Sequence, residues 1–203
     1  MGIRTFVALP LGEGLRARLA EVQQALERQG AFPGYRWLPA GSIHLTLRFL
    51  GDTDESRLPA IEEALRRAAS GRAAFRMALV QVGCFPNPVR PRVVWLGPAA
   101  GDAGVWALME LQGAVERELA PLGFPPEERP FRAHLTVGRP RGEARRLDRI
   151  RVEGAFREAE RLLAPSPPLL EADRLMFIQS ELSRAGARYT PLAAVPLGDV
   201  AGG

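Results

Sequence analysis

The sequence contains no lysine, only two histidines and a single cysteine, Cys84, among its 203 residues. One cysteine excludes a disulfide within the chain and a cysteine-rich zinc finger. No apolar run approaches the roughly eighteen residues of a membrane-spanning helix. Neither a P-loop nor a dinucleotide-binding glycine motif is present. These absences exclude several large classes of protein and predict a soluble, cytoplasmic chain.

Because lysine is absent, all 27 basic residues are arginines, and the net charge is +4. An arginine guanidinium is permanently charged, planar and able to grip a phosphate with two hydrogen bonds. The small positive charge favours an anionic partner. It is too low for a protein that coats nucleic acid without sequence specificity. With 46% hydrophobic residues, residues 1–203 can form a single domain made of two lobes around a shared core.

Hydrophobic periodicity predicts strands and helices in an order that roughly repeats in the second half of the chain. Such a repeat favours an α+β protein of two similar lobes. The expected strands are 3–9, 43–50, 75–82, 92–97, 133–138, 172–182 and 188–197, and the expected helices are 13–29, 56–69, 103–120 and 144–163.

Both histidines precede a threonine by two residues, in "IHLTLRF" and in "AHLTVGR", ninety residues apart. Side chains alternate along a strand, so His44, Thr46 and Arg48 should share one polar face. His134 and Thr136 should share the matching face of the second strand. Arg139 has the wrong parity for that face unless a bulge at Gly138, or the end of the strand, re-aims it.

The histidines, threonines and arginines of the two motifs suit general acid–base catalysis on an anion. Catalytic zinc takes three protein ligands, and neither motif offers a carboxylate or thiol beside its histidine. Two imidazoles without a metal suit paired proton transfer, in which one accepts a proton while the other donates one. Hydroxyl and guanidinium groups nearby suit the oxygens of a tetrahedral anion.

The paired H-x-T motifs resemble those of the 2H phosphoesterase superfamily. Within it, the chain is similar to the bacterial and archaeal RNA 2′,3′-cyclic phosphodiesterases, LigT-like proteins historically called 2′-5′ RNA ligases. Further similar stretches are "RTFVALPL", "YRWLPAGSIHLTLRFLGDT", "GCFPNPVRPRVVWLGP", "RPFRAHLTVGRPR" and "SELSRAGARYTPL". The paired motif is the specific signature among them.

The resemblance implies a bilobal α+β fold in which two pseudo-two-fold-related lobes of mainly antiparallel sheet, with helices outside, enclose a central cleft. It implies that His44 and His134 are catalytic, that Thr46 and Thr136 bind substrate, and that Arg139 helps to hold it. Arg48 is a further substrate-binding candidate from strand parity. The resemblance implies no metal and no nucleotide cofactor.

The expected function is therefore metal-independent hydrolysis of 2′,3′-cyclic phosphates on RNA ends or nucleotides, leaving 2′-phosphates. Reverse 2′-5′ RNA ligation is also expected, with a 5′-hydroxyl taking the place of water. No obligate protein partner and no membrane association are expected. Two alternatives stay open. The chain could be a non-catalytic protein that binds RNA ends or phosphate. It could also be a phosphodiesterase for another small cyclic phosphate or for 2′-5′ oligonucleotides.

Overall fold

The fold, seen in a computed structural model that describes residues 2–99, 101–183 and 186–198, contains two antiparallel sheets. The first sheet has four strands in the order β3 (Leu45–Asp54), β1 (Gly2–Leu9), β8 (Arg174–Ser183) and β9 (Gly186–Pro196). The second has five, in the order β2 (Tyr35–Trp37), β6 (Leu135–Pro140), β5 (Val93–Pro98), β4 (Phe75–Phe85) and β7 (Leu169–Ala172). Each sheet therefore contains one motif strand, β3 or β6, near its edge.

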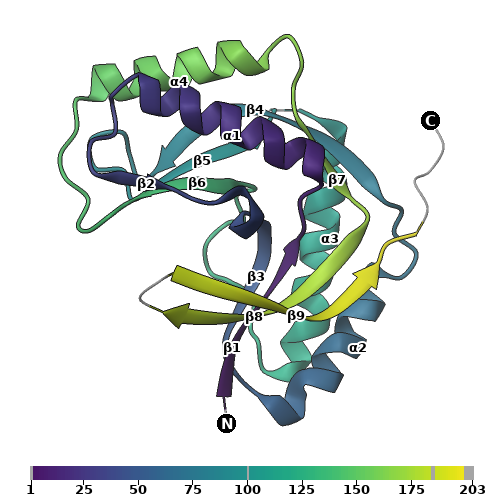
Figure 1. Cartoon of the computed structure of the whole chain (residues 1–203). Coiled ribbons are helices and arrows are strands. Elements are labelled where there is room, and N and C mark those ends of the chain that lie inside the picture. The colour runs from purple at the N-terminus through teal and green to yellow at the C-terminus, as the bar shows by residue number, and fades with distance from the viewer. Residues whose placement is uncertain (1, 100, 184–185, 199–203) are drawn as a thin grey trace.

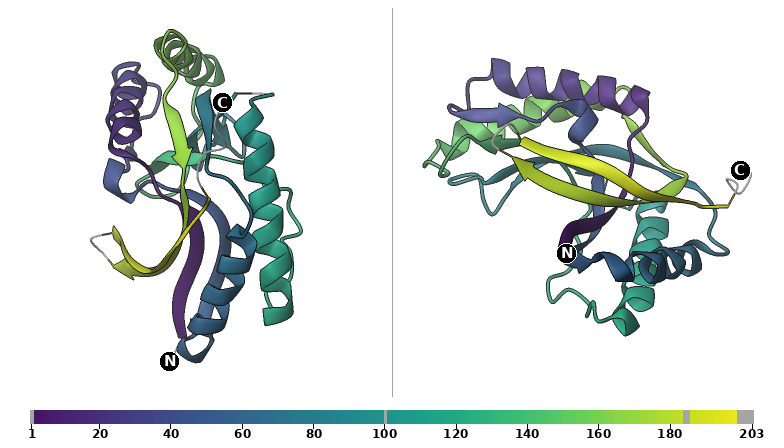
Figure 2. Two further views of the ribbon diagram at one scale, coloured as in Figure 1. Left: turned by 90° about the vertical axis from the view of Figure 1, so that its right-hand side faces the viewer. Right: turned by 60° about the horizontal axis from the view of Figure 1, so that its bottom comes forward.

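Four α-helices cover the sheets in two pairs. Helix α1 (Glu13–Arg28) packs against α4 (Arg149–Leu163) over the second sheet, and α2 (Leu58–Ala69) packs against α3 (Ala103–Leu119) beside the first (Figure 1). Figure 2 shows α2 and α3 side by side; α2 contacts β8 and β9, and α3 contacts β3. No helix within the described ranges is both long and apolar enough to cross a membrane.

The sequence explains the boundaries and buried faces of these helices. Leu15, Leu19, Val22 and Leu26 form the predicted stripe on α1, and all four are buried. Asp102 caps α3, since its carboxylate accepts a hydrogen bond from the Gly104 amide, 2.8 Å away. One hydrophobic cluster includes side chains from all four helices and from both sheets. Both motif strands are therefore anchored to the same core.

The expected α+β fold is confirmed, with local corrections to the predicted elements. The short strands β2 and β7 were missed, because three or four residues carry too little periodicity to be recognised. The helix expected over 144–163 begins only at Arg149. Asp148 ends the preceding loop by accepting hydrogen bonds from the amides of Ile150 and Arg151, as a helix N-cap does.

Candidate functional site

The first motif strand contains a change of register directly after its threonine. On β3, Thr46 pairs with Ala8 of β1, but the next pair is Arg48 with Val7, so Leu47 is an extra residue. An extra residue moves the side chains that follow it, up to the next irregularity, to the other face of the sheet. The expectation that Arg48 shares a face with His44 and Thr46 is therefore wrong.

Arg48 instead points into the protein and is only 7% exposed. Its guanidinium lies 3.1 Å from a carboxylate oxygen of Glu116 on α3 and also donates to the carbonyl of Pro125. It lies 3.5 Å from Glu127 as well. These contacts tie β3 to α3 and to the segment that leads to the second motif. We therefore infer a structural role for Arg48 in the wall of the cavity that it lines together with Thr46 and His134.

The second motif strand has a register change at the same place, with the opposite consequence for its arginine. On β6, Thr136 pairs with Trp95 of β5, and the next pair is Gly138 with Val94, so Val137 is the extra residue. The bulge that would re-aim Arg139 is therefore present. A Cβ at Gly138 would lie 2.7 Å from the Trp37 ring, so the glycine makes room for that ring.

Both histidines are held in the same way by the chain just before them. Nδ1 of His44 lies 3.2 Å from the carbonyl oxygen of Ser42, and Nδ1 of His134 lies 2.8 Å from that of Arg132. A carbonyl oxygen only accepts, so in each imidazole Nδ1 carries the proton and Nε2 is free for chemistry. The two motifs thus present equivalent nitrogens, each able to accept or, once protonated, to donate a proton.

The surroundings of the two histidines favour their neutral forms. Burial lowers the pKa of His44 to about 4, while the hydrogen bond to the Ser42 carbonyl acts to raise it. Burial also lowers the pKa of His134; the Arg132 carbonyl acts to raise it, and the charge of Arg139 lowers it further. An anionic substrate would oppose both shifts, because a nearby negative charge favours the protonated imidazole.

The two motifs meet at one place. Thr46 of the first motif and His134 of the second line the same cavity, which lies between β3, α3 and the segment before β6. On the first sheet, His44 stacks on Phe6 at a centroid distance of 4.6 Å and meets the edge of Tyr189 at 5.0 Å. The Tyr189 side chain was not among the expected site residues.

Arg139 lies near both His134 and Tyr189. Burial lowers the pKa of its guanidinium, the nearby Tyr189 hydroxyl group raises it, and Arg36 lowers it. Arg139 thus interacts electrostatically both with His134 and with Tyr189, which touches His44. Sequence reasoning could have found Tyr189 only through its place in the similar stretch "SELSRAGARYTPL", because a lone tyrosine has no distinctive spacing.

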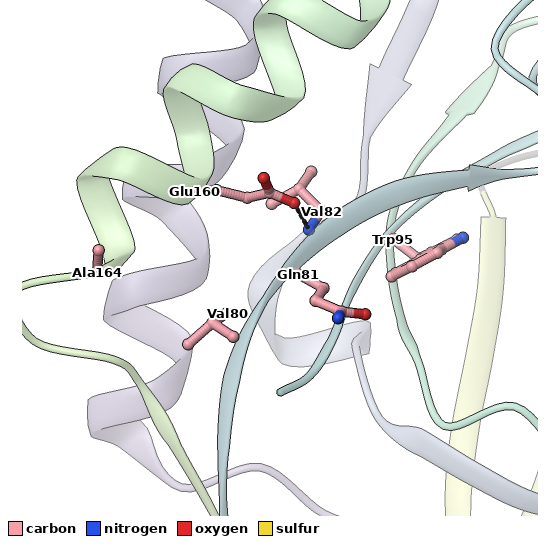
Figure 3. Close-up of a pocket in the computed structure, with 6 residues that line it drawn as sticks. All are labelled: Val80, Gln81, Val82, Trp95, Glu160 and Ala164. Carbon is pink, nitrogen blue, oxygen red and sulfur yellow. Dashed lines mark hydrogen bonds between the residues drawn. The ribbon is translucent and has the colours of Figure 1, made fainter. Parts of the chain in front are cut away.

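A second hollow, between α4 and β4, contains none of the expected site residues. Its carboxylate, from Glu160, accepts a hydrogen bond of 3.0 Å from the main-chain amide of Val82 (Figure 3). That contact joins helix to sheet, so the hollow belongs to the packing of α4. Across the described ranges, no three His, Cys, Asp or Glu side chains gather closely enough to hold a metal ion.

Known proteins are similar to this chain in both sequence and fold. RNA 2′,3′-cyclic phosphodiesterases of Methanothermobacter thermautotrophicus and Aeropyrum pernix are 32% and 35% identical to this chain. The first match covers 95% of this chain and 97% of the relative, and the second covers 88% and 94%.

Two solved structures superpose over nearly the whole chain. A crystal structure of a Thermus thermophilus protein gives a TM-score of 0.72 at 28% identity, covering 97% of this chain and 99% of the other. Escherichia coli LigT in complex with 3′-AMP gives 0.70 at 25% identity, with the same coverage. The model of the family described as LigT like phosphoesterase matches residues 9–95 and 105–189. The chain therefore belongs to the LigT-like phosphoesterase family.

Proposed function

We propose that this protein hydrolyses 2′,3′-cyclic phosphates on RNA ends or nucleotides and leaves a 2′-phosphate. The observation that carries the proposal is the repeated arrangement of His44 and His134, each with Nδ1 bound to a carbonyl and Nε2 free. Relatives named RNA 2′,3′-cyclic phosphodiesterase match nearly the whole length of the chain. RNA as a substrate makes the cytoplasm the proposed place of action.

The proposed reaction needs two proton transfers. Nε2 of one neutral histidine takes a proton from water as the water oxygen attacks phosphorus in line. Nε2 of the other, protonated histidine gives its proton to the ribose 3′-oxygen as the P–O3′ bond breaks. The products are a 2′-phosphate and a 3′-hydroxyl, and exchange with solvent restores both imidazoles. The family resemblance assigns the acid to His44 and the base to His134.

The remaining groups act on the charge of the phosphate. The Thr46 and Thr136 hydroxyls follow each histidine on the same strand and can donate to non-bridging oxygens as their charge changes. The Arg139 guanidinium supplies a fixed positive charge on the same side. Strain in the five-membered ring already raises the energy of the substrate, so the proposed mechanism requires no metal.

The deciding experiment uses purified protein freed of metals with EDTA. It should convert an oligoribonucleotide ending in a 2′,3′-cyclic phosphate to the 2′-phosphate, identified by ³¹P NMR. The His44→Ala/His134→Ala protein is the control for contaminating activity. A strict need for a divalent ion would refute the two-histidine mechanism, and tight binding without any turnover would favour the RNA-end-binding alternative. Faster cleavage of a 2′-5′ oligonucleotide would redirect the assignment to that substrate.

A further inference from the structure

The cavity that Thr46 and His134 share extends well beyond the two motifs. Its volume is about 800 Å³, within the roughly 300–1,000 Å³ of small-molecule sites and more than one phosphate needs. One wall of the cavity is apolar and comes from four parts of the chain. It consists of Phe49 on β3, Phe85 at the end of β4, Met109 on α3 and Phe131 in the segment before β6.

Two of these apolar side chains are conspicuously exposed. Phe49 is 55% exposed and Met109 is 43% exposed. Large apolar side chains that gather around an open cavity mark a place where a ligand covers them. The aromatic rings also lie next to the chemistry, because Phe85 meets the edge of His134 at 5.1 Å and Phe49 lies 5.8 Å from Phe6, on which His44 stacks.

The polar groups in the floor of the cavity are largely engaged with one another. Glu116 receives hydrogen bonds of 3.1 Å from Arg48 and 3.0 Å from Gln112. Both of these bonds go to Oε1, while Oε2 of Glu116 and Nε of Arg48 have no hydrogen-bond partner among the described residues but are buried from solvent. The wall, in contrast, offers aromatic faces to a ligand. Arg132 adds a cation near the rim, with its guanidinium 6.0 Å from the Phe85 ring centre.

These features suit one part of a nucleotide in particular. In a 2′,3′-cyclic nucleotide the phosphate and the base are attached to the same ribose, so a phosphate at the histidines places the base one sugar away. Aromatic side chains stack on any of the four bases, since each base presents a π-face.

We propose that the cavity walled by Phe49, Phe85, Met109 and Phe131 holds the base of the nucleotide that carries the cyclic phosphate. The inference rests on the proposed function and deepens it. Recognition is by stacking, so the enzyme accepts all four bases at the terminal position. It discriminates instead against cyclic phosphates that have no base.

The test compares the four nucleoside 2′,3′-cyclic phosphates with glycerol 1,2-cyclic phosphate, which has the reactive ring but no base. In the wild-type protein, kcat/KM should favour all four nucleotides by about 5- to 150-fold, the range expected from stacking of one base. Phe49→Ala should lower kcat/KM for the nucleotides about tenfold, mainly through KM, with a several-fold smaller loss on glycerol cyclic phosphate. Phe49→Leu should fall between Phe49→Ala and wild type.

Trp106→Ala is the matched control. Trp106 is an aromatic residue of α3 that is 74% exposed and does not line the cavity, so its removal should leave all five rates unchanged. Equal losses on nucleotides and glycerol cyclic phosphate in Phe49→Ala would overturn the proposal, because they would mean that Phe49 acts through Phe6 on His44. Unaltered nucleotide kinetics, or a strong preference for a single base, would also overturn it.

Binding separates this proposal from the proposed function. Calorimetry with adenosine 2′-phosphate and with inorganic phosphate requires no turnover. Phe49→Ala should weaken binding of the nucleotide about tenfold and that of inorganic phosphate much less. If the protein hydrolyses no cyclic phosphate but shows this difference, the base site stands and the proposed reaction fails. Equal weakening of both ligands would remove the base site while leaving any measured hydrolysis intact.

Discussion

Phe49 and Arg139 occupy the same position in the two motif strands, five residues after the histidine in each case. The register change after each threonine turns both side chains to the histidine face of their sheets. The two halves of the site thus repeat the catalytic groups but differ at this position, where one half has an aromatic ring and the other a cation. We infer that Phe49 contacts the base and Arg139 the phosphate, while both histidines and both threonines act on the phosphate.

Gly138→Ala should destabilise the protein and displace Arg139. The new Cβ would lie 2.7 Å from two Trp37 ring atoms, and such overpacking costs about 1–3 kcal/mol. Thermal or urea denaturation measures the loss, and KM for a cyclic nucleotide should rise with it. Gly142→Ala is the control, because its Cβ would meet nothing within 4 Å. A Gly138→Ala protein as stable as wild type would show that the bulge does not depend on this glycine.

Arg48→Met should destabilise the fold. Its activity should fall only in proportion to the amount of folded protein that is lost. The substitution leaves the carboxylate of Glu116 buried without its cation, and breaking such a pair costs about 3–5 kcal/mol. The double variant Arg48→Met/Glu116→Met should recover most of that stability, since it removes both charges. Urea denaturation of the three proteins makes the comparison. A stable Arg48→Met protein with a raised KM would instead return Arg48 to substrate binding.

Much of this fold could be predicted from the sequence, because long amphipathic helices and alternating strands leave strong periodic signals. The histidines and threonines of the site could be predicted as well, because the same H-x-T motif occurs on two predicted strands. The positions of the two arginines could not be predicted by counting residues. One extra residue directly after each motif threonine reverses the parity of the following positions. That bulge depends on pairing with β1 or β5, far away in sequence.

Removing either threonine hydroxyl should slow the reaction without unfolding the protein. Thr46→Val and Thr136→Val preserve shape but lose the donor, and each should lower kcat about 10- to 1000-fold, as expected for loss of one transition-state donor. Thr→Ser at the same positions keeps the hydroxyl and should retain most of the rate. Wild-type rates in both valine variants would mean that the threonines have only a structural role in the sheet.

The pH dependence of kcat/KM should be bell-shaped and displaced to acid pH. The reaction needs one protonated and one neutral imidazole, and burial lowers the pKa of His44 to about 4 and also lowers that of His134. The acid loses its proton as pH rises through these values, so kcat/KM should peak below the ordinary histidine pKa of about 6.5 and fall toward neutrality. A peak above pH 7 would contradict this.

The kcat profile should lie at higher pH than the kcat/KM profile. It reports the enzyme–substrate complex, in which the phosphate anion raises both histidine pKa values. Its two limbs belong to the coupled pair, so neither limb alone identifies the acid. Superimposable kcat and kcat/KM profiles would mean that the bound phosphate does not interact with the histidines.

The assignment of His44 as acid and His134 as base is tested by a leaving group that needs no proton. A 3′-deoxynucleoside 2′-(4-nitrophenyl phosphate) keeps the 2′-linkage and releases nitrophenolate, a stable anion, in place of the 3′-oxygen. With a cyclic nucleotide, His44→Ala and His134→Ala should each lose most of the activity. With the nitrophenyl ester, His44→Ala should recover much of its rate, because no general acid is required, while His134→Ala stays slow. The reverse pattern would exchange the two roles, and recovery by both variants would mean that neither histidine activates water.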